Sequence, residues 1–329
     1  MKICVYGVGA IGGWVATRFE ATDHELSCVD RSDICAVLLR DGVHLTSEDS
    51  LSKVNLPVTD CPVDLGEQDL VIIAVRSMEL VGIVESLQPL LGKDTAVITL
   101  CEGVPWWYLY KHKHKYKPEQ DWLDAVDPNG AIWAAIGPER ALGCIAYPSI
   151  NRKGPGVIEH QFGSRFLLGE PDGSKSKRSQ RVQQAFVDAG LRADVVSDIR
   201  SSLWLRIMAS TAFSLISVLT SKKLDVMFSN YRLRREIVKV MNDIVAVAKS
   251  LGVTPSMTPK ELLDVSVLLG EHKTLMLQDL EGGRQLEIGT LVTAVQELGR
   301  NTGVATDKLD TVVELAAEIG RSAGCYPKK

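Results

Sequence analysis

A stripe of polar residues interrupts the most apolar stretch of the chain. Arg206, Ser210 and Ser214 follow one another at intervals of four, so a helix would place all three on one face. The residues around Arg206 are apolar, and a guanidinium in such surroundings needs an anionic or strongly accepting partner. That partner is either a bound anion or an internal carboxylate such as Glu287 or Asp279, and we favour the bound anion.

Glu287 is a second candidate for chemistry. It stands at the head of a predicted helix, residues 287–299, that otherwise presents apolar side chains such as Ile288 and Leu291. The helix dipole stabilises a carboxylate at this position. The same carboxylate would act as an acid, a base or a ligand contact if it lined an active site. The residue types leave both interpretations open.

The N-terminus combines a glycine pattern with the elements that position a dinucleotide. A predicted strand, residues 2–6, leads directly into Gly7-x-Gly9-x-x-Gly12, and a predicted helix, residues 14–21, follows. The glycines permit, in turn, a tight turn, close approach of the backbone to a pyrophosphate, and close packing of helix on strand. The free N–H groups at the helix N-terminus favour the anion. The alternative is a glycine turn that is needed only for packing.

Strands and helices continue to alternate after this motif. Apolar runs predict strands at 26–29, 69–75 and 95–100, with helices at 32–39 and 78–91 between them. This alternation predicts a doubly wound parallel sheet, and we expect the strands at 143–147, 156–160 and 165–169 to complete the same sheet. Ligands of such sheets bind at the carboxyl ends of the strands, and these ends carry Gly7, Asp30, Arg76 and Glu102.

From residue 199 onward the pattern is helical. Helices are predicted at 199–219, 231–251, 260–269, 273–280, 287–299 and 306–322. The predicted fold class is therefore α/β, with an N-terminal Rossmann-type doubly wound parallel sheet and a C-terminal all-helical domain. We expect a dinucleotide-binding domain over 1–198, with an insertion near 105–127, and a helical substrate domain over 199–329. The cleft between the two domains is the expected site.

The composition excludes several classes of function. Of the 329 residues, 45% are hydrophobic and 24% are charged, and the net charge is −4, so no overall basic field would attract nucleic acid or an anionic membrane. The longest apolar run, residues 207–219, is short for a membrane span. Residues 105–127 break the pattern with aromatic residues between 106 and 110 and the basic run Lys111–Lys117. A nucleic-acid patch is the alternative, but we interpret this segment as a solvated surface insertion that covers part of the sheet, with the role of the basic run undetermined. We expect no metal site at His112 and His114.

The seven cysteines indicate the compartment. Their number is odd, and no C-x-x-C pattern occurs among them. The N-terminus also leads directly into a strand, without the pattern of a signal peptide. We therefore expect reduced thiols in a cytoplasmic protein.

These motifs together resemble the ketopantoate reductase family of NAD(P)H-dependent 2-oxo acid reductases. The resemblance spans nearly the whole chain and is carried by Gly7-x-Gly9-Ala10-Ile11-Gly12, Arg76, Glu102-Gly103, Trp204-x-Arg206, Met276-x-Gln278-Asp279 and Arg284-x-x-Glu287-Ile288. It implies an oxidoreductase that moves a hydride between a nicotinamide and a 2-oxo or 2-hydroxy acid. It also implies cofactor contacts from the glycine loop with Ala10 and Ile11, and from Asp30, Arg31, Arg76 and Gly103.

The chain departs from this family at several positions that the resemblance assigns to the active site. The family implies a lysine at Arg206, asparagines at Ser210, Ser214 and Glu102, and a serine at Leu275, whereas Glu287 is kept. Carried over by position, the catalytic residues are Arg206, Glu287, Ser210 and Glu102, and the substrate-binding residues are Ser214, Thr274 and Leu275.

These departures change the expected chemistry. Arginine effectively cannot lose a proton, so Arg206 would polarise a carbonyl or clamp a carboxylate. The proton for the forming alkoxide would then come from water or from a protonated Glu287. Glu102 adds a negative charge, which favours a cationic or amine-bearing group on the substrate. We therefore expect a substrate other than ketopantoate to be preferred.

The nicotinamide cofactor is a separate question. Asp30 is placed to accept a hydrogen bond from a ribose 2′-hydroxyl and would repel a 2′-phosphate, which favours NAD(H). Arg31 and Arg76 would instead clamp a 2′-phosphate, which leaves NADP(H) open. We favour NAD(H).

Three functions remain open on the sequence. The first is reduction of a 2-oxo acid or oxidation of a 2-hydroxy acid. The second is an imine or opine-type reduction in which Glu102 holds a nitrogen of an amine-bearing substrate. The third is a non-catalytic sensor of NAD(P)H. All three predict a small-molecule ligand and neither nucleic acid nor membrane as a partner, and they leave a homodimer open.

Overall fold

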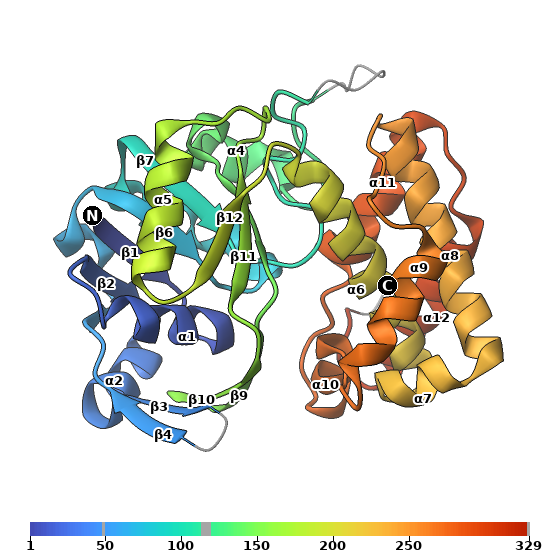
Figure 1. The fold of residues 1–329 in the computed structure, drawn as a ribbon, viewed down its shortest axis with the longest axis horizontal. Helices are drawn as coiled ribbons and strands as arrows, with labels where there is room; N and C mark the ends of the chain where they lie inside the picture. The colour runs from blue at the N-terminus through green and yellow to red at the C-terminus, as the bar shows by residue number, and fades with distance from the viewer. Residues whose placement is uncertain (48–49, 113–119, 328–329) are drawn as a thin grey trace. The chain divides into compact units, whose positions relative to one another are not determined.

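The computed structural model describes residues 1–47, 50–112 and 120–327. The chain divides into two compact units (Figure 1). The first unit contains residues 1–101 and 129–199, and the second contains residues 102–128 and 200–329. Residues 102–128 include the predicted insertion and cluster with the second unit. Most of the basic run, residues 113–117, lies outside the described residues.

The first unit is built on a parallel sheet of five strands in the order β5-β2-β1-β6-β7. The strands are β1 (Lys2–Tyr6), β2 (Glu25–Val29), β5 (Val58–Thr59), β6 (Gln68–Ile73) and β7 (Leu91–Thr99). The side chains from Leu70 to Ile73 are fully buried, as expected for a strand covered on both faces. Helices α1 (Ala10–Phe19), α2 (Ser32–Asp41) and α3 (Leu80–Leu87) connect these strands. The predicted Rossmann-type α/β sheet is confirmed.

The remaining strands do not complete this sheet, and that part of the prediction is wrong. A four-stranded sheet contains β3 (Val43–Ser47), β4 (Ser50–Val54), β9 (Ser149–Gly154) and β10 (Val157–Phe162). A three-stranded sheet contains β8 (Gly143–Ala146), β11 (Arg165–Gly169) and β12 (Arg192–Val195). The local pattern identifies a strand, but it carries no information about the neighbour with which that strand pairs.

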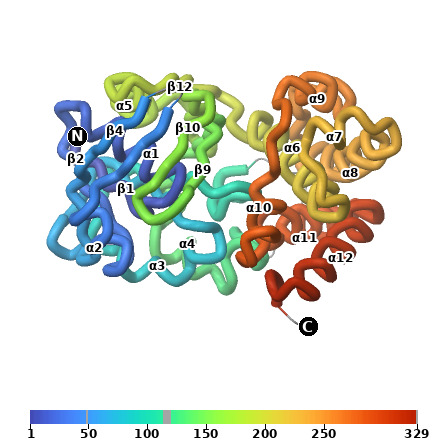
Figure 2. The backbone as a smooth tube through the Cα atoms, turned by 90° about the horizontal axis from the view of Figure 1, so that it is seen from below, coloured from blue at the N-terminus to red at the C-terminus, as the bar shows by residue number. Residues whose placement is uncertain are grey.

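The four-stranded sheet packs on α1, the helix that follows the glycine loop. In Figures 1 and 2, β9 and β10 run beside this helix. The indole of Trp14 stacks on the His160 ring of β10, with 4.8 Å between ring centroids. A Cβ at Gly13 would lie only 2.5 Å from the side chain of Ile158. The second sheet therefore holds α1 in place from its side.

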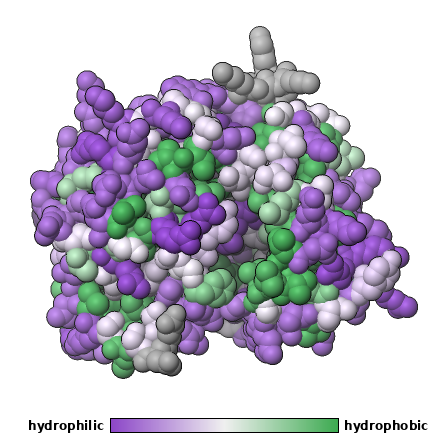
Figure 3. Space-filling view, in the orientation of Figure 1, coloured by the Kyte–Doolittle hydropathy of each residue, from purple (hydrophilic) through white to green (hydrophobic). Residues whose placement is uncertain are grey.

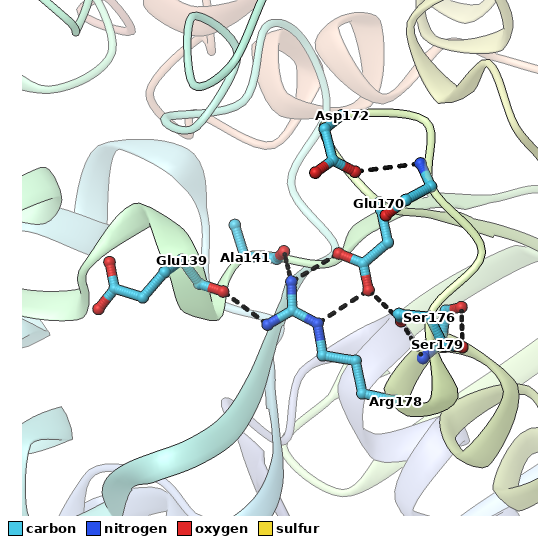
Figure 4. Close-up of polar contacts among 8 residues, drawn as sticks. Glu139, Ala141, Glu170, Asp172, Ser176, Arg178 and Ser179 are labelled. Atoms are coloured by element: carbon cyan, nitrogen blue, oxygen red, sulfur yellow. Dashed lines mark hydrogen bonds and ion pairs between the residues drawn. The ribbon is translucent and has the colours of Figure 1, made fainter.

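An ion pair between the partly exposed Arg178 and the buried Glu170 fastens helix α5 (Lys177–Asp188) to the three-stranded sheet (Figure 4). Arg178 donates to both carboxylate oxygens of Glu170, from Nε at 2.8 Å and from Nη2 at 2.6 Å. Its remaining N–H groups reach the carbonyls of Glu139 at 2.6 Å and Ala141 at 3.0 Å. Glu170 is only 4% exposed, so its charge depends on this bidentate partner. Helix α4 (Ala131–Ile136) precedes the two carbonyls.

The second unit is helical, apart from turns, throughout its described part. Its helices are α6 (Ile199–Thr220), α7 (Leu224–Ser229), α8 (Tyr231–Ser250), α9 (Pro259–Ser266), α10 (Leu275–Glu281), α11 (Ala294–Thr302) and α12 (Asp307–Ser322). A π-helical turn, Gly289–Thr293, precedes α11. The predicted all-helical region is confirmed. Two details differ, because α7 was not predicted and the helix expected from residue 287 begins as this π-turn.

Helix α6 forms the apolar centre of this unit. By length and composition it would suffice to cross a membrane, and it is longer than the predicted apolar run. Of its most apolar stretch of 18 residues, 67% is buried inside the protein, as in the core helix of a globular protein. The fully buried Trp204 donates from Nε1 to the hydroxyl of Tyr108 at 2.7 Å. This bond anchors the segment around Tyr108 in the core of the second unit.

The first part of the segment after Glu102 is packed in the core rather than solvated. Trp106, Trp107 and Tyr108 are at most 3% exposed. The buried guanidinium of Arg200 donates from Nη2 to the carbonyls of Tyr108 at 2.8 Å and Tyr110 at 2.7 Å. The interpretation of this part as a solvated surface insertion is therefore wrong for Trp106, Trp107 and Tyr108, which belong to the core of the second unit.

Candidate functional site

The guanidinium of Arg206 and the carboxylate of Glu102 form an ion pair within the second unit. Nη2 of Arg206 donates to Oε1 of Glu102 at 2.7 Å. The two side chains are 37% and 28% exposed, so Arg206 is only partly enclosed, contrary to the sequence expectation of a largely buried guanidinium. Two predicted catalytic residues that lie 104 positions apart are thus brought together.

The internal partner of Arg206 differs from those that the sequence suggested. Asp279 pairs instead with Arg284, with 2.8 Å between carboxylate oxygen and Nε. In the described part of the chain, the guanidinium of Arg206 is bonded to Glu102 alone. An arginine side chain has five N–H donors, so the groups beyond this one bond are available to a ligand.

The loop that carries Glu102 is fastened to the π-helical turn. The N–H of Val104 donates to the carbonyl of Thr290 at 3.0 Å, and the hydroxyl of Thr290 donates to the carbonyl of Glu102 at 3.1 Å. Gly103 between them has a φ of +93°, and a Cβ there would lie 2.4 Å from the carbonyl oxygen of Thr290. Glycine permits both the backbone conformation and the close approach. Gly103 therefore has a packing role, and its predicted contact with the cofactor stays a prediction.

Helix α6 is bonded to the same π-helical turn. The buried hydroxyl of Thr211 donates to the carbonyl of Leu291 at 2.9 Å. Ser210 donates its hydroxyl to the carbonyl of Arg206, one turn earlier in the helix, at 2.8 Å. Ser214 is 4% exposed. The loop at 102–104, helix α6 and the turn at 289–293 thus form one hydrogen-bonded group that holds the ion pair.

Glu287 lies immediately before this group. Its side chain is half-buried, and the π-helical turn begins two residues later. Short π-helical segments are frequent at functional sites. The placement agrees with the two interpretations of Glu287 that the sequence left open, because the residue lies near a helix start and, along the chain, near Thr290 and Leu291, which bond the segments that carry the ion pair.

Thr274 and Leu275 stand at the start of α10. The hydroxyl of Thr274 accepts a hydrogen bond from the N–H of Leu277 at 3.2 Å and so caps the helix. Leu275 is 52% exposed. Figure 3 shows that apolar patches lie among the hydrophilic side chains on the visible face of the molecule. The family serine is therefore replaced by an exposed apolar side chain beside a hydroxyl that is used in capping.

The glycine loop of the first unit has the geometry of a dinucleotide cradle. Gly7 has a φ of +98°, and a Cβ at Gly12 would lie 2.0 Å from the carbonyl oxygen of Gly7. A Cβ at Gly9 would meet no heavy atom within 4 Å, so open space faces the backbone at the N-cap of α1. Ala10 and Ile11 form the first turn of that helix, where N–H groups favour an anion. These residues fit a pyrophosphate.

The charged residues at the strand ends bear on the choice between NAD(H) and NADP(H). The carboxylate of Asp30 accepts from the N–H of Val8 at 2.6 Å and from the N–H of Arg31 at 2.8 Å. Arg31 is paired with Asp33, with 3.2 Å between Nε and the carboxylate, and this hydrogen bond raises the pKa of Arg31. Arg76 is the N-cap residue of the short 3₁₀ turn Ser77–Glu79 that leads into α3, and its backbone N–H donates to the carboxylate of Glu79 at 3.2 Å.

Sequence reasoning missed the residues that fasten the site together. Thr211 and Thr290 are buried hydroxyls on otherwise apolar helical stretches. A buried hydroxyl needs a hydrogen-bond partner, so a threonine in an apolar stretch was the signal in the sequence that could have pointed to these residues. The signal does not identify the partner, because each hydroxyl bonds a backbone carbonyl on a distant segment.

Two family models match the chain. The model described as ketopantoate reductase PanE/ApbA matches residues 3–173, and the model for the C terminal part of ketopantoate reductase PanE/ApbA matches residues 198–320. A curated protein named 2-dehydropantoate 2-reductase, from Mesorhizobium japonicum, is 38% identical over 327 residues. The match covers 99% of this chain and 100% of that protein.

Solved structures agree with these matches. A crystal structure from Ralstonia solanacearum, provisionally assigned as a ketopantoate reductase, is 31% identical, with a TM-score of 0.92 and 99% of both chains covered. D-mandelate dehydrogenase with NADH and anilino(oxo)acetate has a TM-score of 0.84 at 18% identity, covering 98% of this chain and 99% of its own, and this likeness concerns the fold alone. The full-length matches in sequence and structure show that this chain belongs to the ketopantoate reductase family of NAD(P)-dependent oxidoreductases that act on CH–OH groups.

Proposed function

We propose that the protein reduces the keto group of a 2-oxo acid, or oxidises the corresponding 2-hydroxy acid. The observation that supports this most directly is the guanidinium of Arg206, which Glu102 holds through Nη2 while other N–H groups stay available. A planar guanidinium suits bidentate binding of a carboxylate or polarisation of a carbonyl. When bound, NAD(P)H supplies the hydride. The first unit would hold the dinucleotide, and the second unit would hold the substrate.

The other predicted residues support binding and proton supply in this proposal. Ser210, Ser214, Thr274 and Leu275 would contact the substrate. Because Arg206 keeps its proton, Glu287 or a water molecule would deliver the proton to the alkoxide oxygen. Glu287→Gln removes this acid while keeping the shape of the side chain. We expect it to lower kcat at least about tenfold if Glu287 is the proton donor. An unchanged kcat across the pH profile would assign the step to water.

The charges of the site argue for a substrate other than ketopantoate. Arg206 contributes one positive charge, and Glu102 offsets it directly at 2.7 Å. Where the family resemblance implies a lysine and a neutral asparagine, this chain has a charge-balanced pair. A simple anionic substrate would therefore be held less strongly. A kcat/KM on ketopantoate of about 10⁴ M⁻¹s⁻¹ or more would overturn this specificity proposal.

We favour NAD(H) as the cofactor, with NADP(H) as the alternative. The carboxylate of Asp30 stands at the end of β2 and would accept from a ribose 2′-hydroxyl. Arg31, the nearest candidate for a 2′-phosphate, already pairs with Asp33. We further propose a cytoplasmic location. We leave a homodimer open, which light scattering after size-exclusion chromatography would test.

The test is a panel of 2-oxo acids, ketopantoate included, assayed for oxidation of NADH and NADPH. Arg206→Met removes the guanidinium, and we expect it to lower kcat/KM about 100-fold or more. Arg206→Lys restores the residue that the family resemblance implies, and we expect it to keep part of the activity. Equal rates for wild type and Arg206→Met would refute the role of Arg206. Binding of NADH without turnover of any compound would favour the non-catalytic sensor.

A second candidate is the reduction of an imine formed from an oxo acid and an amine. The carboxylate of Glu102 favours it, because a carboxylate beside the reacting centre attracts a protonated amine or iminium. Turnover that appears only when an amine is added to the oxo acid would support this function. Turnover that is independent of amines would exclude it as the main activity.

A further inference from the structure

We propose that Thr290 is a positioning residue. It determines the orientation of the Arg206 guanidinium by holding Glu102 in place. This inference rests on the proposed function, because it concerns how the same site presents Arg206 to a 2-oxo acid. Among the described residues, no hydrogen bond joins Thr290 to the guanidinium. Thr290 acts through its hydrogen bond to the backbone carbonyl of Glu102.

Thr290 is placed to hold the loop at 102–104 in position. It is 7% exposed and bonded twice to the loop, through its hydroxyl to Glu102 and through its carbonyl to Val104. Gly103 between these contacts approaches the same carbonyl so closely that a side chain would not fit. The backbone of the loop at 102–104 is therefore held by Thr290. The position of this backbone determines the direction of the Glu102 side chain.

The other half of the ion pair depends on the same turn. Arg206 lies five residues before Thr211 on helix α6, and Thr211 donates to the carbonyl of Leu291. Glu102 is thus held through Thr290, and Arg206 is held through the residue next to Thr290 in the chain. A shift of this turn would move both partners of the ion pair together.

This arrangement matters because Arg206 is long and only partly enclosed. Glu102 is its bonded partner among the described residues, so the direction of its remaining N–H groups depends on where that carboxylate lies. A misplacement of about 1 Å in a positioning group is sufficient to lower activity strongly. The hydroxyl of Thr290 is the contact that distinguishes this residue from a purely apolar packing residue.

The experiment compares Thr290→Val and Thr290→Ser in two backgrounds, wild type and Glu102→Asn. The readouts are the kinetic constants on the best 2-oxo acid of the panel and, independently of turnover, the Kd of oxamate measured by calorimetry with NADH present. We expect Thr290→Val to weaken oxamate binding and kcat/KM about 3- to 10-fold, the range of one hydrogen bond. We expect Thr290→Ser to recover both within about twofold, because it keeps the hydroxyl.

The Glu102→Asn background separates positioning from a structural role. If Thr290 acts through the ion pair, Thr290→Val should change oxamate affinity less than about twofold there, because no ion pair is left to position. Thr302→Val is the matched control. Like the hydroxyl of Thr290, the hydroxyl of Thr302 donates to a backbone carbonyl, in this case that of Leu298 within α11 at 2.8 Å. This control should leave both readouts unchanged.

The outcomes distinguish this inference from the proposed function. An equal loss in both backgrounds, or a similar loss in Thr302→Val, would overturn the positioning role while leaving the reductase intact. Oxamate binding that follows the predicted pattern without turnover of any oxo acid would support the positioning role and overturn the reductase. Failure of wild type both to bind oxamate and to turn over any oxo acid of the panel would overturn both.

Discussion

Replacing Glu102 with asparagine tests the electrostatic argument at the centre of the site. The change removes one negative charge and restores the amide that the family resemblance implies at this position. In the structure, Oε1 of Glu102 lies 2.7 Å from Nη2 of Arg206 and offsets its charge. Without that carboxylate, the full positive charge of Arg206 faces the substrate. We expect Glu102→Asn to lower KM for a simple anionic 2-oxo acid.

The magnitude follows from the geometry of the pair. A substrate carboxylate on the other side of the guanidinium would lie about 6 Å from that of Glu102, and the repulsion between them is about 1–3 kcal/mol at an effective dielectric constant of about 20–40. Freeing the Arg206 side chain costs about 1 kcal/mol in conformational entropy on binding. With a repulsion of about 1.4–2.8 kcal/mol, the balance of about 0.4–1.8 kcal/mol predicts a decrease of KM of about 2- to 20-fold. Because the pair is partly exposed, it contributes at most about 1 kcal/mol to folding, so the variant should stay folded.

The assay is the initial rate of NAD(P)H oxidation against the best anionic oxo acid and against an amine-bearing analogue, at low and at high salt. For the amine-bearing compound the sign reverses, since Glu102 attracts a cation, and KM should rise. Both effects should diminish as salt screens the exposed charges. An unchanged or higher KM for the anionic acid at low salt, with an unaltered melting temperature, would refute the reasoning.

The remaining predictions concern the cofactor and stability. Asp30→Ala should raise the use of NADPH relative to NADH, because it removes the charge that repels a 2′-phosphate; an unchanged ratio of kcat/KM values would remove Asp30 from the argument. Arg178→Met should lower the free energy of unfolding in urea by about 3 kcal/mol, because it leaves the buried carboxylate of Glu170 without its partner; a loss below about 1 kcal/mol would contradict this. Hydrogen bonds from Lys308 and a second lysine hold the pKa of Glu236 at about 2, so its contribution to stability is complete above the ordinary value of 4.5 and is lost as the pH falls toward 2. Glu236→Gln should therefore cost about 1 kcal/mol at pH 7 and nothing near pH 2, whereas a constant difference between these pH values would refute the assignment.

The sequence predicted those parts of the fold that local pattern determines. The strand at 2–6 and the helices at 199–219 and 306–322 correspond closely to β1, α6 and α12, and the helix predicted over 14–21 is present as α1 but begins earlier, at Ala10, within the glycine pattern. Their signals are glycines with special backbone conformations and apolar residues at helical spacing, which act within a few residues of the chain. Pairing of strands is a property of distant segments. The strand at 156–160 was therefore recognised but was placed in the wrong sheet, although its true neighbours are β3 and β9.

The same distinction applies to the candidate site. Arg206 stood out because its charge conflicts with its apolar surroundings, and Glu102 stood out because it departs from a family pattern. Neither signal links the two residues, because each leaves the identity of the partner open. The structure links them, and this changes the meaning of both departures. An arginine in place of lysine and a glutamate in place of asparagine are, as a pair, a single change that makes the pair neutral, where the implied lysine and asparagine would carry one positive charge.

This pairing also explains why a reversal of one residue alone should not recover the family chemistry. Arg206→Lys by itself would leave a lysine beside Glu102, and the carboxylate would favour the charged form of the ammonium and so oppose proton donation. Glu102→Asn by itself would free the guanidinium, which still keeps its proton. Only both changes together would provide a lysine beside a neutral amide. If the proposed chemistry is correct, a gain of activity on ketopantoate should therefore exceed the product of the two single effects, and that excess would measure how strongly the two departures depend on each other.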